Sequence, residues 1–220
     1  MSLLRIVFVV ALLAAAAACE TVGTVREVDR MKALAQSGDV DALVTYQVTC
    51  VSGTEGCDQA HMIKADACLQ RAQSVGVVGR IPYASCAAEG YEAALDAAAA
   101  SGDGRVDGDR LARSELEALR LWRDAASRSE GTPINRRLGA AGGQVGDRQP
   151  ARPEGPYYEA DSLLWLVNAG IAQPPCPTLA LAQERIIAAR AAAAAGTVDV
   201  GQLDRDLANT ARVAGCELGT

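Results

Sequence analysis

The chain has 220 residues, of which 50% are hydrophobic and 4% aromatic, and its formal net charge at pH 7 is −6. A chain of this length and composition can bury a core, and its acidic balance argues against a nucleic-acid-binding protein, which needs a basic surface to contact phosphates. Alanine, leucine and valine dominate, and the single phenylalanine is Phe8. We therefore expect close-packed helices rather than a β-sandwich, which depends on β-branched and aromatic residues.

The N-terminal segment, residues 1–18, has the features of a secretory signal peptide. Arg5 precedes an unbroken apolar run from Ile6 to Ala18. This run is too short to span a bilayer comfortably, because a transmembrane helix needs about 20 residues. We therefore expect the segment to be removed on export.

The end of the apolar run, AAAC at residues 16–19, resembles the lipobox of bacterial lipoproteins. The resemblance implies that the sulfur of Cys19 is lipidated and that residues 19–24 form a lipidated tether to a membrane. Glu20 in the next position implies an outer-membrane lipoprotein of the cell envelope that faces the periplasm. The alternative is ordinary signal cleavage nearby, which would leave Cys19 as a free thiol.

The other cysteines form an even set, which indicates three disulfides in a compartment that oxidises thiols. They are Cys50, Cys57, Cys68, Cys86, Cys176 and Cys216. Cys176 stands at the start of one expected helix and Cys216 just after the end of the next, so the two meet in an antiparallel hairpin. Cys68 and Cys86 can face each other across a second hairpin, and the remaining two would close a short loop. The partners within these last two pairs could also be exchanged.

Apolar residues recur at helical spacing over residues 25–130, which we expect to form an N-terminal helical domain. Asp39 is placed to cap one of its helices. The expected helices cover residues 25–38, 39–50, 58–73, 83–100 and 110–127.

Residues 131–156 show no such period and contain six glycines and four prolines. This composition indicates a flexible linker or an exposed loop between two regions. Helices are expected again over residues 157–220, as a C-terminal helical hairpin region. Its last helix, residues 200–214, would begin with a capping box of Asp199 and Gln202.

The expected fold class is all-α, built from antiparallel helical hairpins and stapled by disulfides. Two segments, GDVDALVTYQVTC at residues 38–50 and EALRLWRDAA at residues 117–126, resemble the helices of tetratricopeptide repeats. The resemblance implies a degenerate helical-repeat array whose inner groove holds peptides or helices of a partner protein. An irregular helical bundle is the alternative architecture.

Residues 101–110, SGDGRVDGDR, resemble part of an EF-hand calcium loop, in which Asp103, Gly104 and Asp107 would match. However, Arg110 stands where the loop needs its last acidic ligand, so a solvated turn between helices is the preferred interpretation.

The sole histidine, His61, lies near Cys57 and Cys68 in the sequence and could belong to a zinc site. These cysteines are better used in disulfides in an oxidising compartment. We therefore expect no metal site and no cofactor.

Three further patterns could support catalysis or anion binding. Glu89, Glu92 and Asp96 stand at helical spacing and could act as paired carboxylates in sugar hydrolysis, although a solvated helix face is the simpler interpretation. A group of glycines mimics a phosphate loop but lacks the preceding strand, namely Gly139, Gly142, Gly143 and Gly146. Arginines in the same stretch could contact anionic headgroups or simply be exposed, namely Arg136, Arg137, Arg148 and Arg152.

The expected function is that of a non-enzymatic, membrane-anchored envelope lipoprotein that binds an envelope protein as an adaptor or assembly factor. Aromatic residues dominate interface energies, so the candidate anchors are aromatic. They are Tyr46, Tyr83, Tyr91 and Trp122, each of which could instead pack in the core. The alternatives are a cell-wall-binding protein or hydrolase, and an inhibitor of an envelope-targeting hydrolase. No nucleic-acid partner and no small-molecule cofactor are expected.

Overall fold

The computed structural model describes residues 23–102, 105–193 and 198–219, and these residues form helices without any strand. Residues 23–37 are helical. The helices that follow are α2 (Val40–Thr45), α3 (Cys57–Ser74), α4 (Val77–Ser101), α5 (Gly108–Ala125), α6 (Arg128–Arg148), α7 (Glu154–Asn168), α8 (Pro175–Ala192) and α9 (Val200–Ala214). The expected all-α fold class is confirmed.

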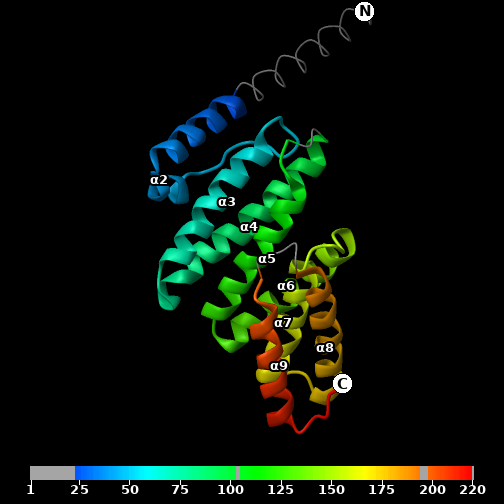
Figure 1. Cartoon of the computed structure of the whole chain (residues 1–220). Coiled ribbons are helices and arrows are strands. Elements are labelled where there is room, and N and C mark those ends of the chain that lie inside the picture. The colour runs from blue at the N-terminus through cyan, green and yellow to red at the C-terminus, as the bar shows by residue number, and fades with distance from the viewer. Residues whose placement is uncertain (1–22, 103–104, 194–197, 220) are drawn as a thin grey trace, which may run out of the picture.

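Consecutive helices from α2 to α9 pack against each other in chain order and form a series of antiparallel hairpins. Figure 1 shows this series running along the molecule, with α2 and α3 toward one end and α8 and α9 at the other. Among the described residues, none of the helices is both long and apolar enough to cross a membrane. The signal segment and Cys19 lie outside the described residues.

Side-chain caps begin several of these helices where the sequence places Asp or Ser. Asp39 accepts a hydrogen bond from the Ala42 amide at α2, and Asp199 does the same from the Gln202 amide at α9. Such caps satisfy amide groups that a helix leaves without a partner in its first turn. The predicted starts of α2 and α9 are therefore confirmed. The predicted capping box at α9 is only half formed, because the Gln202 side chain contacts Asp206 and Arg205 instead of the Asp199 amide.

Two expectations at the N-terminal end need correction. The tether expected over residues 19–24 is helical in its described part, and Thr24 is only 4% exposed. The helix expected over residues 39–50 ends at Thr45. The physical reason for this early end is a tertiary contact, since the Thr49 amide donates to the Glu27 carboxylate at 2.8 Å instead of to a helical carbonyl.

The linker expected over residues 131–156 is wrong, because most of it forms α6 and the start of α7. A capping box of Ser127 and Glu130 begins α6. The glycines of the segment are a packing surface: a Cβ on Gly142 would lie 2.9 Å from the Glu159 amide nitrogen, and one on Gly155 would lie 2.3 Å from the Gly146 amide nitrogen. The absence of side chains lets the backbones of α6 and α7 approach closely.

Adjacent glycines of α6 therefore predict opposite effects on stability. Gly142→Ala should destabilise the protein by about 1–3 kcal/mol, because its methyl group would meet backbone atoms of α7. Gly143→Ala should stabilise it by up to about 1 kcal/mol, because the nearest atom to its Cβ lies 4.0 Å away and alanine favours the helix. Urea unfolding of the two variants checks both signs, and a loss for Gly143→Ala would contradict the assigned packing.

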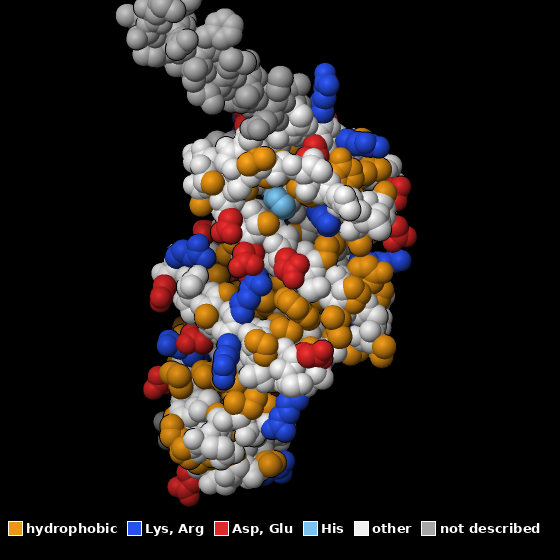
Figure 2. Space-filling model, turned by 180° about the vertical axis from the view of Figure 1, so that it is seen from behind, with side chains coloured by type: hydrophobic (Ala, Val, Ile, Leu, Met, Phe, Trp, Pro, Cys, Tyr) orange, Lys and Arg blue, Asp and Glu red, His pale blue; other side chains and the backbone are white. Residues whose placement is uncertain are grey.

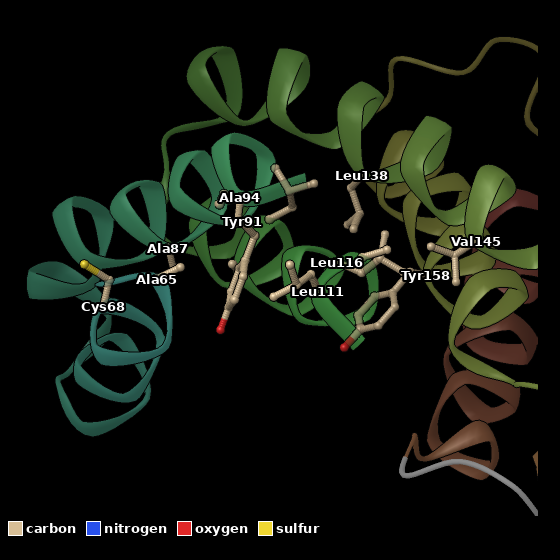
Figure 3. Packing of buried hydrophobic residues seen from close by; sticks show 14 of the residues in the cluster. Ala65, Cys68, Ala87, Tyr91, Ala94, Leu111, Leu116, Leu138, Val145 and Tyr158 are labelled. Carbon is tan, nitrogen blue, oxygen red and sulfur yellow. The ribbon is translucent and has the colours of Figure 1, made fainter. Parts of the chain in front are cut away.

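The main core lies between α3, α4, α5, α6 and α7. Figure 3 shows Tyr91 of α4, Leu111 and Leu116 of α5 and Leu138 of α6 among its side chains. A second cluster joins α7, α8 and α9 around Leu179, and a third joins the N-terminal helices to α3. Because α6 and α7 contribute to the main core, residues 131–156 connect the N-terminal and C-terminal regions as packed structure.

Three disulfides join neighbouring parts of the chain, and the predicted pairing is confirmed. Cys50 is bonded to Cys57, Cys68 to Cys86 and Cys176 to Cys216. The second bond links α3 to α4, and the third links the start of α8 to the end of α9. The alternative exchange of partners among the first four cysteines does not occur.

Candidate functional site

Helices α4 and α6 both pack on α5, and the surface between them is hollowed in two places. One hollow, of about 540 Å³, lies at the N-terminal ends of α4 and α6 and is lined by Ile81, Trp122, Ala126, Glu130, Pro133, Ile134 and Arg137. The other, of about 410 Å³, includes Glu92, Leu95, Asp96, Glu115, Arg137, Ala141 and Arg148 in its lining. Arg137 belongs to both, so we call the two hollows together the α4–α6 groove.

Arg137 bridges the groove from α6 to the other two helices. Its Nη2 atom donates to Glu115 Oε1 of α5 at 2.6 Å and to the Ala88 carbonyl of α4 at 3.3 Å. The same atom forms an ion pair with Glu92 Oε2 of α4 at 3.2 Å. A single guanidinium therefore holds three helices together and divides an apolar end of the groove from a charged end.

The charged end has more carboxylates than arginines. Glu92, Asp96 and Glu115 line it together with Arg137 and Arg148. Burial raises the pKa of the Glu115 carboxyl, the neighbouring Arg137 opposes the rise, and the negative charges of Glu92 and Asp96 add to it. This end of the groove is consequently a site that favours added positive charge.

The apolar end is built around Trp122 of α5, with Ile81 of α4 and Pro133 of α6 beside it. Trp122 is partly buried and packs against the main core. Close by in the chain, the first turn of α4 exposes 53% of Val77 and 96% of Val78. Figure 2 shows hydrophobic side chains gathered across the middle of one face of the molecule, with acidic and basic side chains beside them.

Of the four candidate anchors, only Trp122 lines the groove. Tyr91 is wrong as a surface anchor, because its ring is fully buried in the main core and its hydroxyl donates to Asp66 Oδ1 at 2.7 Å. Burial raises the pKa of this hydroxyl. Tyr46 packs against the N-terminal cluster, and Tyr83 lies under the Arg71 guanidinium, 5.9 Å from the ring centre.

The sequence did not identify Glu115 as a functional residue, and it placed Arg137 in a linker. A signal for helix α6 was present in the sequence, because the apolar residues Ile134, Leu138 and Val145 recur at helical spacing and are buried. The high glycine content of the segment concealed this period.

His61 lies close to Cys50 and Cys57 rather than to the predicted pair Cys57 and Cys68, and the three potential ligand atoms lie within 4.8 Å of one another. Both sulfurs are bonded to each other in a disulfide. Burial lowers the pKa of the imidazole, while the charge of Glu27 opposes that shift. Because the thiolates that zinc would need are absent in this state, the cluster supports no metal site.

The part of the calcium-like segment that the structure describes is used in other contacts. Asp107 caps α5 by accepting from the Arg110 amide at 2.9 Å. Arg110 itself forms an ion pair with Asp66 at 3.2 Å. Asp103 and Gly104 lie outside the described residues.

Three other residues that the sequence singled out, Glu89, Arg136 and Arg152, lie outside the groove. Glu89 and Lys64 line a different hollow, of about 510 Å³, beside His61, and Figure 2 shows the histidine above acidic side chains. Arg136 is exposed, and Arg152 forms an ion pair with Glu154 at 2.8 Å.

Comparisons with protein-family models, with curated proteins and with solved structures gave no match. The function therefore has to be inferred from the residues of the groove and from the features of the N-terminal segment.

Proposed function

We propose that this protein is a membrane-anchored lipoprotein of the cell envelope that acts as a protein-binding adaptor or assembly factor. Its occupant is an amphipathic helix of another envelope protein, held in the α4–α6 groove with an apolar side chain beside Trp122. The observation that carries this proposal is the apolar hollow of about 540 Å³ that Trp122, Ile81 and Pro133 line between α4 and α6.

The shape of the groove suits a helix. Helices α4 and α6 run in the same direction on either side of α5, so the groove between them follows the helix axes. Amphipathic helices bind such grooves through apolar side chains spaced by one or two turns. An aromatic residue in the lining provides a large apolar contact area, which is typical of residues that dominate interface energies.

The proposed location depends on the sequence. The lipobox-like residues 16–19 would attach the chain to a membrane through Cys19, and three disulfides suit an oxidising envelope compartment. Lipid anchoring would hold the groove near the membrane surface, on the periplasmic side of the outer membrane. An adaptor of this kind requires no cofactor.

The test is site-specific photo-crosslinking in living cells with the full-length, lipidated protein. A photoreactive phenylalanine analogue replaces Ile81 or Pro133 at the groove, or Ile187 on α8, which is 56% exposed and outside the groove. The same envelope protein should be captured at both groove positions and not from position 187. Capture should fall at least about fivefold when Trp122→Ala is added, because truncating an aromatic anchor commonly removes 1 kcal/mol or more of binding energy.

The test also separates other occupants of the groove. A product containing two copies of this chain at both groove positions would overturn the adaptor proposal and indicate self-association. Equal capture at position 187 would show that the groove is not the contact surface. Loss of capture in Cys19→Ser would link the interaction to lipid anchoring.

A cell-wall hydrolase remains the second candidate, and one observation favours it. Glu115 and Glu92 both contact Arg137, and burial raises the pKa of Glu115, as in an acid paired with a carboxylate. Release of peptidoglycan fragments that is abolished in Glu92→Gln would support this candidate, whereas the adaptor proposal expects no such activity. A captured partner that is itself a hydrolase would indicate an inhibitor.

A further inference from the structure

A ridge of acidic residues follows the C-terminal half of α4 along the groove. Glu92 and Asp96 are exposed on it and line the charged end, whereas Glu89 of the same helix lines the hollow beside His61. Helix α4 carries no lysine or arginine after Arg80. Glu115 lies below the ridge on α5, with only 12% of its side chain exposed. The carboxylates come from two helices, so their proximity is a property of the fold.

The arginines of the same hollow do not balance these carboxylates. Arg137 is shared between Glu115 and Glu92. Arg148 donates to the Gln144 carbonyl of its own helix at 3.3 Å. Two guanidiniums therefore face the three carboxylates of Glu92, Asp96 and Glu115, and the exposed Asp96 is available to an incoming cation.

The apolar and acidic ends lie a definite distance apart. Both are lined by α6, the first by Pro133 and Ile134 and the second by Ala140 and Ala141. Seven residues of α-helix make about two turns and span roughly 11 Å. A ligand that fills both ends must carry its two contacting groups at about this spacing.

We propose that the helix bound by the groove is basic as well as amphipathic. An apolar side chain, leucine or larger, enters beside Trp122, and a lysine or arginine about two helical turns away reaches Glu92 and Asp96 at the acidic end. This inference deepens the proposed adaptor function and rests on it.

The electrostatics of the groove explain the preference. A cation beside Glu92 and Asp96 reduces the repulsion that these carboxylates exert on the largely buried Glu115, while Arg137 stays in its bridging position. A carboxylate at the same place in the ligand would add a fourth negative charge to the hollow. The ligand charge therefore sets specificity, and the apolar contact beside Trp122 sets most of the affinity.

The experiment compares two fluorescein-labelled helical peptides that differ at one position. Both carry a leucine anchor, and about two turns from it one has lysine and the other has glutamate. Fluorescence anisotropy measures their Kd for the full chain lacking the signal segment, with its disulfides intact. The lysine peptide should bind about threefold to thirtyfold more tightly, and the difference should shrink as salt is added.

Variants locate the effect. Glu92→Gln with Asp96→Asn should weaken the lysine peptide about threefold to tenfold and bring the two peptides close together. Glu184→Gln is the matched control, because Glu184 is exposed on α8 outside the groove, and it should leave both Kd values unchanged. Trp122→Ala should weaken both peptides alike, since both carry the leucine anchor.

The outcomes separate this inference from the adaptor function. Equal binding of the two peptides, with loss of both in Trp122→Ala, would overturn the charge preference and leave the groove as a docking site. Binding of neither peptide would overturn the two-point arrangement, and in that case photo-crosslinking decides the adaptor function on its own.

Discussion

Replacing Arg123 by methionine should destabilise the folded protein by about 3–5 kcal/mol, one of the largest effects of any single substitution in this chain. The Arg123 side chain of α5 is only 3% exposed and forms an ion pair with Asp161 of α7 at 2.8 Å. It also donates to Asn135 Oδ1 of α6 at 3.1 Å. Its Nη2 atom also pairs with Asp124 Oδ1 at 2.6 Å. Removing Arg123 leaves the buried Asp161 with only the weaker influence of Arg120, and the loss of a buried partner is the source of a cost this large.

The same interaction predicts how the loss depends on pH. Burial raises the pKa of the Asp161 carboxyl, and Arg123 opposes that rise. Without Arg123 the pKa of Asp161 in the folded state rises further above its value in the unfolded state. The penalty is then fully present above the raised pKa and is relieved as the pH falls through it, because the folded protein takes up the proton.

Urea unfolding followed by circular dichroism, at neutral pH and at about pH 5, measures both effects. Arg120→Met is the matched control, since Arg120 lies one turn earlier on α5, is 34% exposed and pairs with Asp124 at 3.7 Å, and its loss should be about 1 kcal/mol or less. Asp161→Asn added to Arg123→Met should recover part of the stability. Equal losses of unfolding free energy for the two arginine variants would show that the pair of Arg123 with Asp161 stabilises the fold no more than an exposed ion pair does.

Removing the Cys176–Cys216 disulfide through the double change to alanine should cost about 4 kcal/mol. This bond closes a loop with a sequence separation of 40, and the loss of chain entropy in the unfolded state grows with loop length. On the same relation the Cys50–Cys57 bond, with a separation of 7, is worth about 2 kcal/mol. Neither Cys176 nor Cys216 is buried, so the substitution creates little core cavity.

Hydrogen exchange measured by mass spectrometry localises this loss. The bond joins the start of α8 to the end of α9, whose cluster of buried residues is separate from the main core. Amides of α8 and α9 should therefore exchange faster in the variant, while those of α4 and α5 keep their protection. Uniform acceleration through the chain would mean that the C-terminal hairpin unfolds together with the rest and not as a separate unit.

The proposed binding surface and the buried ion pair of Arg123 use different side chains of α5. Trp122 and Glu115 face the groove, whereas Arg123 points into the contact with α6 and α7. Substitutions of the exposed groove residues Glu92 and Asp96 should change binding with little change in unfolding free energy, whereas Trp122→Ala also removes packing against the main core, so its unfolding free energy is measured alongside its binding. This separation makes the proposed groove testable in a folded protein.

Several features of this protein could be predicted because they depend on residues close in sequence. The apolar period and the alanine content predicted helices, and Asp39 and Asp199 marked the starts of α2 and α9. The six cysteines other than Cys19 form an even set, and the places of Cys176 and Cys216 at helix ends predicted that these two pair. Local hydrogen bonds and the short reach of a disulfide make such features readable from sequence.

The groove could not be predicted, because whether its residues are buried, packed or exposed depends on which residues lie opposite them in the fold. The glycines of residues 131–156 read as a linker until α7 is placed against them, where a Cβ on Gly142 would lie 2.9 Å from a backbone nitrogen. The sequence offered Tyr91 as a candidate surface anchor, but in the fold its ring is buried in the main core. Sequence alone determined most of the helices, the caps of α2 and α9 and the pairing of Cys176 with Cys216. Only the tertiary structure decided which glycines pack, which aromatic ring remains in the groove and which carboxylates meet, because those contacts join residues far apart in the chain.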